Sequence, residues 1–93
     1  MKLVQFKELK LVVESVESDS GLFVVSLDKN DDSKYNLHFY RRATLKTLYH
    51  EKRYTVATQR GSVKSYSSLD TVSSEIIKLG GFRFVVDFSD EIK

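Results

Sequence analysis

The sequence predicts a single small α+β domain spanning residues 1–93, with a mostly antiparallel sheet and one main amphipathic helix packed on one face. Three observations predict this class. Apolar and polar residues alternate through much of the first forty positions, which is the period of a half-buried strand. Arg60-Gly61 supplies a tight turn between two extended runs. After residue 67 the chain carries the start, the apolar stripe and the stop of a helix.

Composition sets the broad class of the protein. The chain has 93 residues, of which 41% are hydrophobic and 30% charged, so we expect one compact core rather than disorder. It has no cysteine, which excludes disulfides, thiolate metal sites and a cysteine nucleophile and is typical of a reducing compartment. The opening "MKLVQFKELK" is too charged for a signal peptide, and no run of ~20 apolar residues occurs. These features predict a cytoplasmic protein.

The first predicted unit is an antiparallel meander from residue 9 to residue 40. In "LKLVVESVE", Leu9, Leu11 and Val13 alternate with polar residues, which indicates a strand, although Val12 lies on the polar side. The turn "SDSG" leads to the β-branched run "LFVVSL" at 22–27, and "DKNDDS" leads to "KYNLHFY" at 34–40. Three strands joined by two short turns predict a meander.

The middle of the chain is less clear. Residues 42–52, "RATLKTLYHEK", have helical spacing but contain threonines that suit a strand; we interpret them as a short helix and leave the strand open. A hairpin then spans 53–67 around Arg60-Gly61, with Gln59 opposite Ser62. This register puts Tyr54 and Val56 on the core face and Tyr66 on the outer face.

The strongest local pattern predicts a helix at about 68–79. Ser67-Ser68-Leu69-Asp70 is typical of a helix N-terminus, and Gly80-Gly81 is typical of a helix end. The apolar stripe of this helix consists of Leu69, Val72, Ile76 and Leu79. A final strand is predicted at 82–88, with Phe82, Phe84, Val86 and Phe88 on its buried face.

No pattern in the chain is typical of an enzyme. The two histidines, His38 and His50, have no cysteine or second histidine clustered with them, so we interpret His38 as a partly exposed sheet residue and His50 as part of a solvated loop. The sequence also lacks a G-x-S-x-G elbow and the glycine-rich phosphate loops. We therefore expect no catalytic residue, no metal and no cofactor.

Positive charge is concentrated in one segment. Residues 41–64 carry seven Lys or Arg and one acid, Glu51, while the segments on either side each carry two more acids than bases. All five tyrosines lie in or beside this segment. Cations can replace the counterions of phosphates, and aromatic faces can stack bases. We therefore predict a nucleic-acid-binding module, for single strands or backbone contacts, through Arg41, Arg42, Lys46, Lys52, Arg53, Tyr54, Arg60, Lys64 and Tyr66.

The alternative is a protein-interaction or inhibitory module. In general style the chain is similar to small accessory proteins carried by plasmids and phages. An unpaired sheet edge can accept a strand from another chain, including a second copy of this one. The first predicted strand has apolar residues on both faces, so this alternative predicts a homodimer or heterocomplex that buries Leu11, Val12 or Val13. A solvated basic segment without function is the simplest explanation of the charge.

Overall fold

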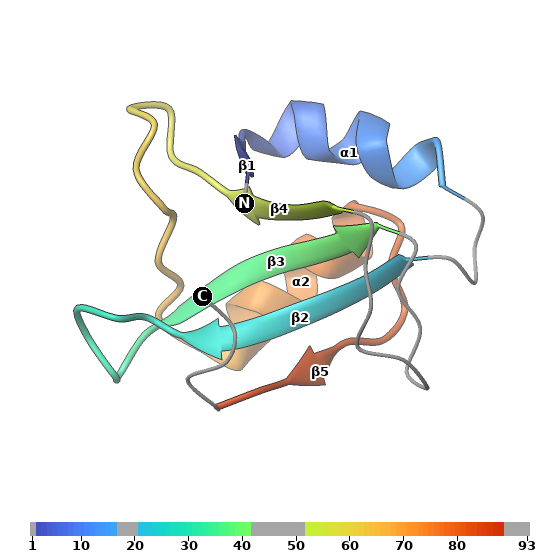
Figure 1. The fold of residues 1–93 in the computed structure, drawn as a ribbon. Helices are drawn as coiled ribbons and strands as arrows, with labels where there is room; N and C mark the ends of the chain where they lie inside the picture. The colour runs from blue at the N-terminus through green and yellow to red at the C-terminus, as the bar shows by residue number, and fades with distance from the viewer. Residues whose placement is uncertain (1, 17–20, 42–51, 89–93) are drawn as a thin grey trace.

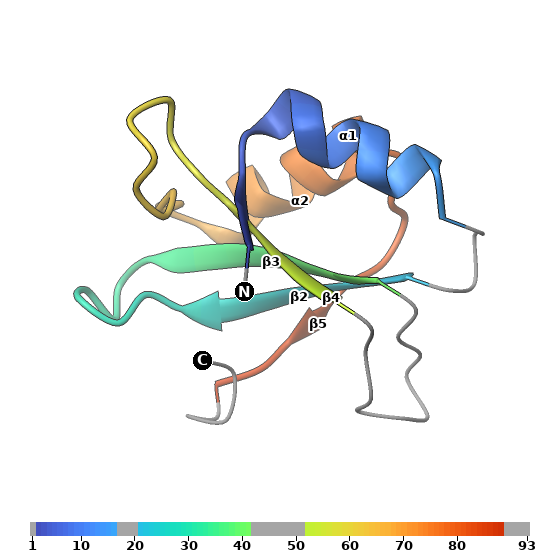
Figure 2. The same cartoon turned by 45° about the horizontal axis from the view of Figure 1, so that its top comes forward.

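The computed structural model describes residues 2–16, 21–41 and 52–88, which form a five-stranded sheet and two helices. Both helices lie on one face of the sheet (Figure 1, Figure 2). The α+β class is therefore confirmed, but the sheet is mixed rather than mostly antiparallel. In chain order the elements are β1 (Lys2–Val4), α1 (Phe6–Glu14), β2 (Gly21–Leu27), β3 (Tyr35–Arg41), β4 (Lys52–Val56), α2 (Leu69–Lys78) and β5 (Val85–Val86).

The strands are ordered β1-β4-β3-β2-β5 across the sheet. The three central strands pair antiparallel, and the predicted hairpin of 22–27 with 34–40 is confirmed, with Phe23 opposite Phe39. The two short outer strands pair parallel to their neighbours, β1 with β4 and β5 with β2. The chain leaves β1 into α1 and reaches β5 after α2, so neither parallel pair is joined directly by a hairpin turn.

The predicted strand in "LKLVVESVE" is wrong, because residues 9–14 of this segment belong to helix α1. Leu9 is completely buried whereas Leu11 is 69% exposed, so the two residues do not share a face as a strand would require. Helical spacing explains the burial: Phe6, Leu9 and Val13 are separated by three and four positions and pack toward the core. The meander from 9 to 40 is thus reduced to the β2–β3 hairpin, and the sheet edge proposed for a partner at Leu11, Val12 and Val13 does not exist.

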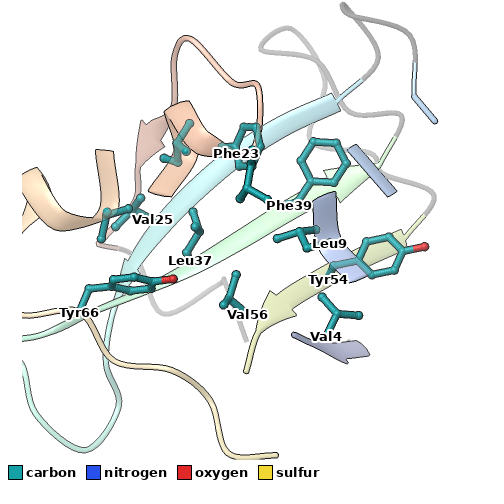
Figure 3. Close-up of a cluster of buried hydrophobic side chains, with 12 residues drawn as sticks. Val4, Leu9, Phe23, Val25, Leu37, Phe39, Tyr54, Val56 and Tyr66 are labelled. Carbon is teal, nitrogen blue, oxygen red and sulfur yellow. The ribbon is translucent and has the colours of Figure 1, made fainter. Parts of the chain in front are cut away.

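One hydrophobic core fills the space between the helices and the sheet. It takes alternate residues from the strands, because successive side chains point to opposite faces (Figure 3). Leu9 of α1 and Val72 of α2 meet this layer from the helix side. The buried core consists of Val4, Leu9, Phe23, Val25, Leu37, Phe39, Tyr54, Val56, Tyr66, Val72, Ile76 and Leu79.

Helix α2 confirms the prediction made for residues 68–79. The Ser68 side chain caps the helix by accepting a hydrogen bond from the Thr71 backbone N–H at 3.2 Å. Val72, Ile76 and Leu79 are all buried, and Leu69 packs beside them. The helix ends at Lys78 with Leu79 as its C-cap, and the next residue, Gly80, has a φ of +92° in the left-handed region that glycine adopts without strain. The predicted cap, stripe and stop therefore all occur in the structure.

The final strand is shorter than predicted. Only Val85 and Val86 form β5, beside Val24 and Val25 of β2. Phe84 and Val86 do pack against the core, as expected, but Phe82 and Phe88 are 74% and 62% exposed. Placing these two rings on the buried face was wrong, because β2 pairs with the chain only between them and the rings lie beyond the paired positions.

The predicted hairpin at 53–67 is partly wrong in register. The turn exists, but Ala57 pairs with Val63, which shifts the pairing by one position from Gln59 opposite Ser62. Beyond it the chain leaves β4 and Tyr66 pairs with Tyr35 at the start of β3 through two backbone hydrogen bonds. Because of this change of partner, Tyr66 points into the core and not to the outer face.

Asp28 joins the β2–β3 turn to the segment before α2. Its carboxylate accepts hydrogen bonds from the Asn36 amide at 3.0 Å, from the Ser65 hydroxyl at 2.5 Å and from the Asn30 backbone N–H at 2.8 Å. These bonds, the one from Ser65 first, lower the pKa of Asp28. The predicted turn "DKNDDS" is thus a fixed part of the fold.

The interpretation of residues 42–52 as a short helix falls almost entirely outside the described residues, which resume at Lys52 with β4. Helices α1 and α2 both lack the length and the apolar run that would take a helix across a membrane.

Candidate nucleic-acid interface

Three of the predicted site residues come together at one end of the β3–β4 pair. Arg41 is the last residue of β3 and lies directly opposite Lys52, the first residue of β4. Arg53 follows and lies opposite Tyr40. We call Arg41, Lys52 and Arg53 the basic end. The segment connecting its two strands carries Arg42 and Lys46, which are outside the described residues.

The basic end has charge on both faces of the sheet. Lys52 lies on the helix side, with its Nζ 5.5 Å from the centre of the Tyr54 ring. Arg53, one position along, projects from the opposite face, where its charge acts on His38. We call this opposite face the distal face; its residues on the central strands are Leu22, Val24, Ser26, Asn36, His38, Tyr40, Arg53 and Thr55.

The rings of Tyr54 and Tyr66 are not surfaces for bases. Tyr54 is 5% and Tyr66 2% exposed, and both belong to the hydrophobic core. The Tyr66 hydroxyl points to the Glu75 carboxylate at 3.4 Å, and burial, followed by that negative charge, raises the pKa of Tyr66. Their place among the predicted contact residues therefore needs correction: both tyrosines stabilise the fold.

Lys64 and Arg60 lie away from the basic end. The Lys64 ammonium is 3.1 Å from the Glu75 carboxylate and 5.0 Å from the centre of the Tyr66 ring. Its charge therefore forms an ion pair with α2. Arg60 is exposed in the turn that follows β4, at the opposite end of that strand (Figure 1). The seven predicted residues that the structure describes do not form one continuous patch.

The distal face contains a hydrogen-bonded histidine that the sequence did not reveal. His38 is 6% exposed, so the interpretation as a partly exposed residue was wrong. Its Nε2 lies 2.8 Å from the Ser26 hydroxyl and its Nδ1 2.7 Å from the Thr55 hydroxyl, so the ring joins three strands. Burial, and then the charge of Arg53, lowers the pKa of His38 to about 4.

This arrangement does not make a catalytic triad. Serine and histidine are within hydrogen-bonding distance, but the group on the far side of the ring is a threonine hydroxyl rather than a carboxylate, and all three side chains are buried. A base with a pKa near 4 is also weak at neutral pH. The histidine is best understood as a neutral hydrogen-bonding link between strands.

Metal ligands are not grouped in the described residues: no three His, Asp or Glu side chains there lie close enough to hold an ion.

Comparisons of the chain with protein-family models, with curated proteins and with solved structures gave no match. The basic end and the sheet edges are therefore the features of the structure that bear on function.

Proposed function

We propose that this protein is a non-enzymatic module that binds nucleic acid through the basic end. The observation that carries the proposal is the direct pairing of Arg41 with Lys52. Two cationic side chains on directly opposite residues can both donate to one phosphate group, and such charge-assisted contacts are the strong ones. This juxtaposition supports a ligand rich in phosphate.

Charge is also distributed unevenly along the sheet. The basic end lies at one end of β3, and the β2–β3 turn, with Asp28, Asp31 and Asp32, lies at the other (Figure 1). Two lysines of that turn, Lys29 and Lys34, are exposed there. A polyanion is therefore drawn to the end of β3 that carries Arg41 and away from the three carboxylates.

An aromatic ring accompanies the cations. Tyr40 lies opposite Arg53 on the distal face and is only partly buried, unlike Tyr54 and Tyr66. An unpaired base can stack on a tyrosine ring, whereas bases inside a duplex are already stacked on one another. The combination of Tyr40 with three cations supports a single-stranded ligand held mainly by its backbone.

The proposal is tested by the binding of fluorescently labelled oligonucleotides at low salt, followed by anisotropy. We expect the double variant Lys52→Gln, Arg53→Gln to weaken binding roughly tenfold or more, because two phosphate contacts are lost. The matched control is Lys29→Gln, Lys34→Gln, which removes the same charge from the opposite end of β3 and should bind like the wild type. Equal loss in both double variants would show that net charge and not the basic end is responsible.

Absence of binding to single-stranded and duplex DNA and RNA at low salt would remove the proposal altogether. A Tyr40→Leu variant separates stacking from charge: we expect it to weaken binding to a single strand more than binding to a duplex. The fold of each variant is checked by circular dichroism, because Lys52 and Arg53 lie within a strand.

A further inference from the structure

The β5 edge has an unusual symmetry. β5 is the outermost strand of the sheet formed by the described residues, and the chain around it reads "FRFVVDF" from 82 to 88. Counted outward from Val85, this segment is self-complementary. Phe82 corresponds to Phe88, Arg83 to Asp87 and Phe84 to Val86.

We propose that β5 pairs antiparallel with β5 of a second copy of this chain, with Val85 opposite Val85. In this two-fold arrangement each Arg83 lies opposite an Asp87 of the other copy, and each Phe82 lies opposite a Phe88. Opposite charges and aromatic pairs across neighbouring strands both stabilise a sheet. The proposal is independent of nucleic-acid binding.

Backbone geometry permits this register. The backbone N–H of Asp87 donates to the Val25 carbonyl oxygen of β2 at 2.8 Å. The backbone N–H and C=O groups of Asp87 therefore point inward, toward β2. Successive residues of a strand direct their backbone N–H and C=O groups to opposite sides of the strand. The backbone groups of Phe84 and Val86 therefore point toward the outer edge of the sheet. Centring the pairing on Val85 puts Phe84 opposite Val86, so outward-pointing groups meet outward-pointing groups.

The side chains around β5 also suit an edge that is covered by a second copy better than an edge open to solvent. Phe82 and Phe88 lie at the two ends of β5, 74% and 62% exposed. In the part of the chain that the structure describes, Arg83 makes no ion pair; its guanidinium lies 5.3 Å from the centre of the Phe82 ring. Charged side chains normally keep other strands away from an exposed edge, but here Arg83 and Asp87 are placed so that, in the two-fold pairing, each meets its opposite charge.

Charge reversal tests the register. We expect the wild type to show concentration-dependent dimerisation in sedimentation equilibrium, and Arg83→Asp or Asp87→Arg to weaken it roughly tenfold or more, because each change puts like charges opposite one another twice. The two variants mixed together should dimerise. In the mixed pair, one copy carries an acid at both positions 83 and 87 and the other carries a base at both, so each position meets its opposite charge. Restored association in the mixture supports the pairing and could not come from a purely structural role of either residue.

Two results would overturn the proposal. One is a wild type that stays monomeric at submillimolar concentration. The other is a dimer whose strength is unchanged in both variants, which would place the interface elsewhere. Amide hydrogen exchange gives a measurement that needs no substitution: the N–H groups of Phe84 and Val86 should exchange more slowly as concentration rises, and equal exchange at all concentrations would exclude β5 pairing.

Discussion

The imidazole of His38 and the hydroxyl of Thr55 lie 2.7 Å apart, on directly opposite residues of β3 and β4. The other ring nitrogen faces Ser26 on β2 at 2.8 Å. A neutral imidazole donates from one nitrogen and accepts at the other, and hydroxyl groups can fill either role, so the network is satisfied without a charge. His38 therefore links the three central strands as a neutral group.

Stability should depend on pH through His38. Its pKa is about 4 in the folded protein, below the ordinary value of 6.5, so the unfolded chain takes up the proton first as pH falls. The contribution to stability is fully present above pH ~6.5 and is lost as pH falls toward ~4; its size is about 3 kcal/mol. Urea unfolding at a series of pH values measures it.

The variant His38→Gln is the control for this effect. Glutamine keeps a donor and an acceptor for Ser26 and Thr55 but does not titrate. We expect the variant to be less stable than the wild type at pH 7 and to show a much flatter pH dependence between 4 and 6.5. Equal pH dependence in the two proteins would assign the effect to the carboxylates instead.

The register of α1 predicts opposite results for two neighbouring leucines. Leu9 is fully buried, so Leu9→Ala should lower the free energy of unfolding by ~2 to 5 kcal/mol. Leu11 is 69% exposed, so Leu11→Ala should change it by no more than ~0.5 kcal/mol. Chemical denaturation of both variants decides between helix and strand, because a strand would put both residues on the same face and give similar losses.

A similar pair tests α2. Ile76→Ala should cost ~2 to 5 kcal/mol because Ile76 is 1% exposed in the core. Its neighbour Ile77 is 67% exposed, and Ile77→Ala should be nearly neutral. A loss below ~1 kcal/mol for Ile76→Ala, measured by denaturant unfolding, would mean that the helix is rotated from the position described.

Nucleic-acid binding at the basic end should change the titration of His38. The charge of Arg53 contributes to lowering the pKa of His38, so a phosphate bound to Arg53 should raise this pKa. The imidazole resonances can be followed by NMR with and without a saturating oligonucleotide. An unchanged pKa in the presence of bound oligonucleotide would place the phosphate away from Arg53.

The elements best predicted from the sequence are those with local signals of more than one kind. In α2 the Ser68 cap, the apolar stripe and Gly80 all indicate the same helix, and a cluster of turn residues precedes both β2 and β3. Helix α1 was missed because Leu9, Leu11 and Val13 also fit a two-residue period. The helical spacing of Phe6, Leu9 and Val13 was present in the sequence and was the more informative pattern.

The candidate site was only partly predictable, because its geometry depends on register. The pairing of Arg41 with Lys52 requires knowing that β3 and β4 are neighbours, and the burial of Tyr66 requires its bridge to Tyr35. Likewise, nothing local to His38 shows that hydroxyl groups from residues 26 and 55 flank its ring. Contacts between distant parts of the chain carry this information, and composition does not.

The salt dependence of oligonucleotide binding tests the proposed function most directly. For the wild type, the logarithm of the binding constant should fall linearly with the logarithm of salt concentration, because phosphate contacts release counterions. Lys52→Gln, Arg53→Gln should reduce this slope by up to ~2, since each phosphate contact contributes ~1. Lys29→Gln, Lys34→Gln and Arg60→Gln should leave it unchanged. A slope unaffected by loss of Lys52 and Arg53 would contradict binding at the basic end.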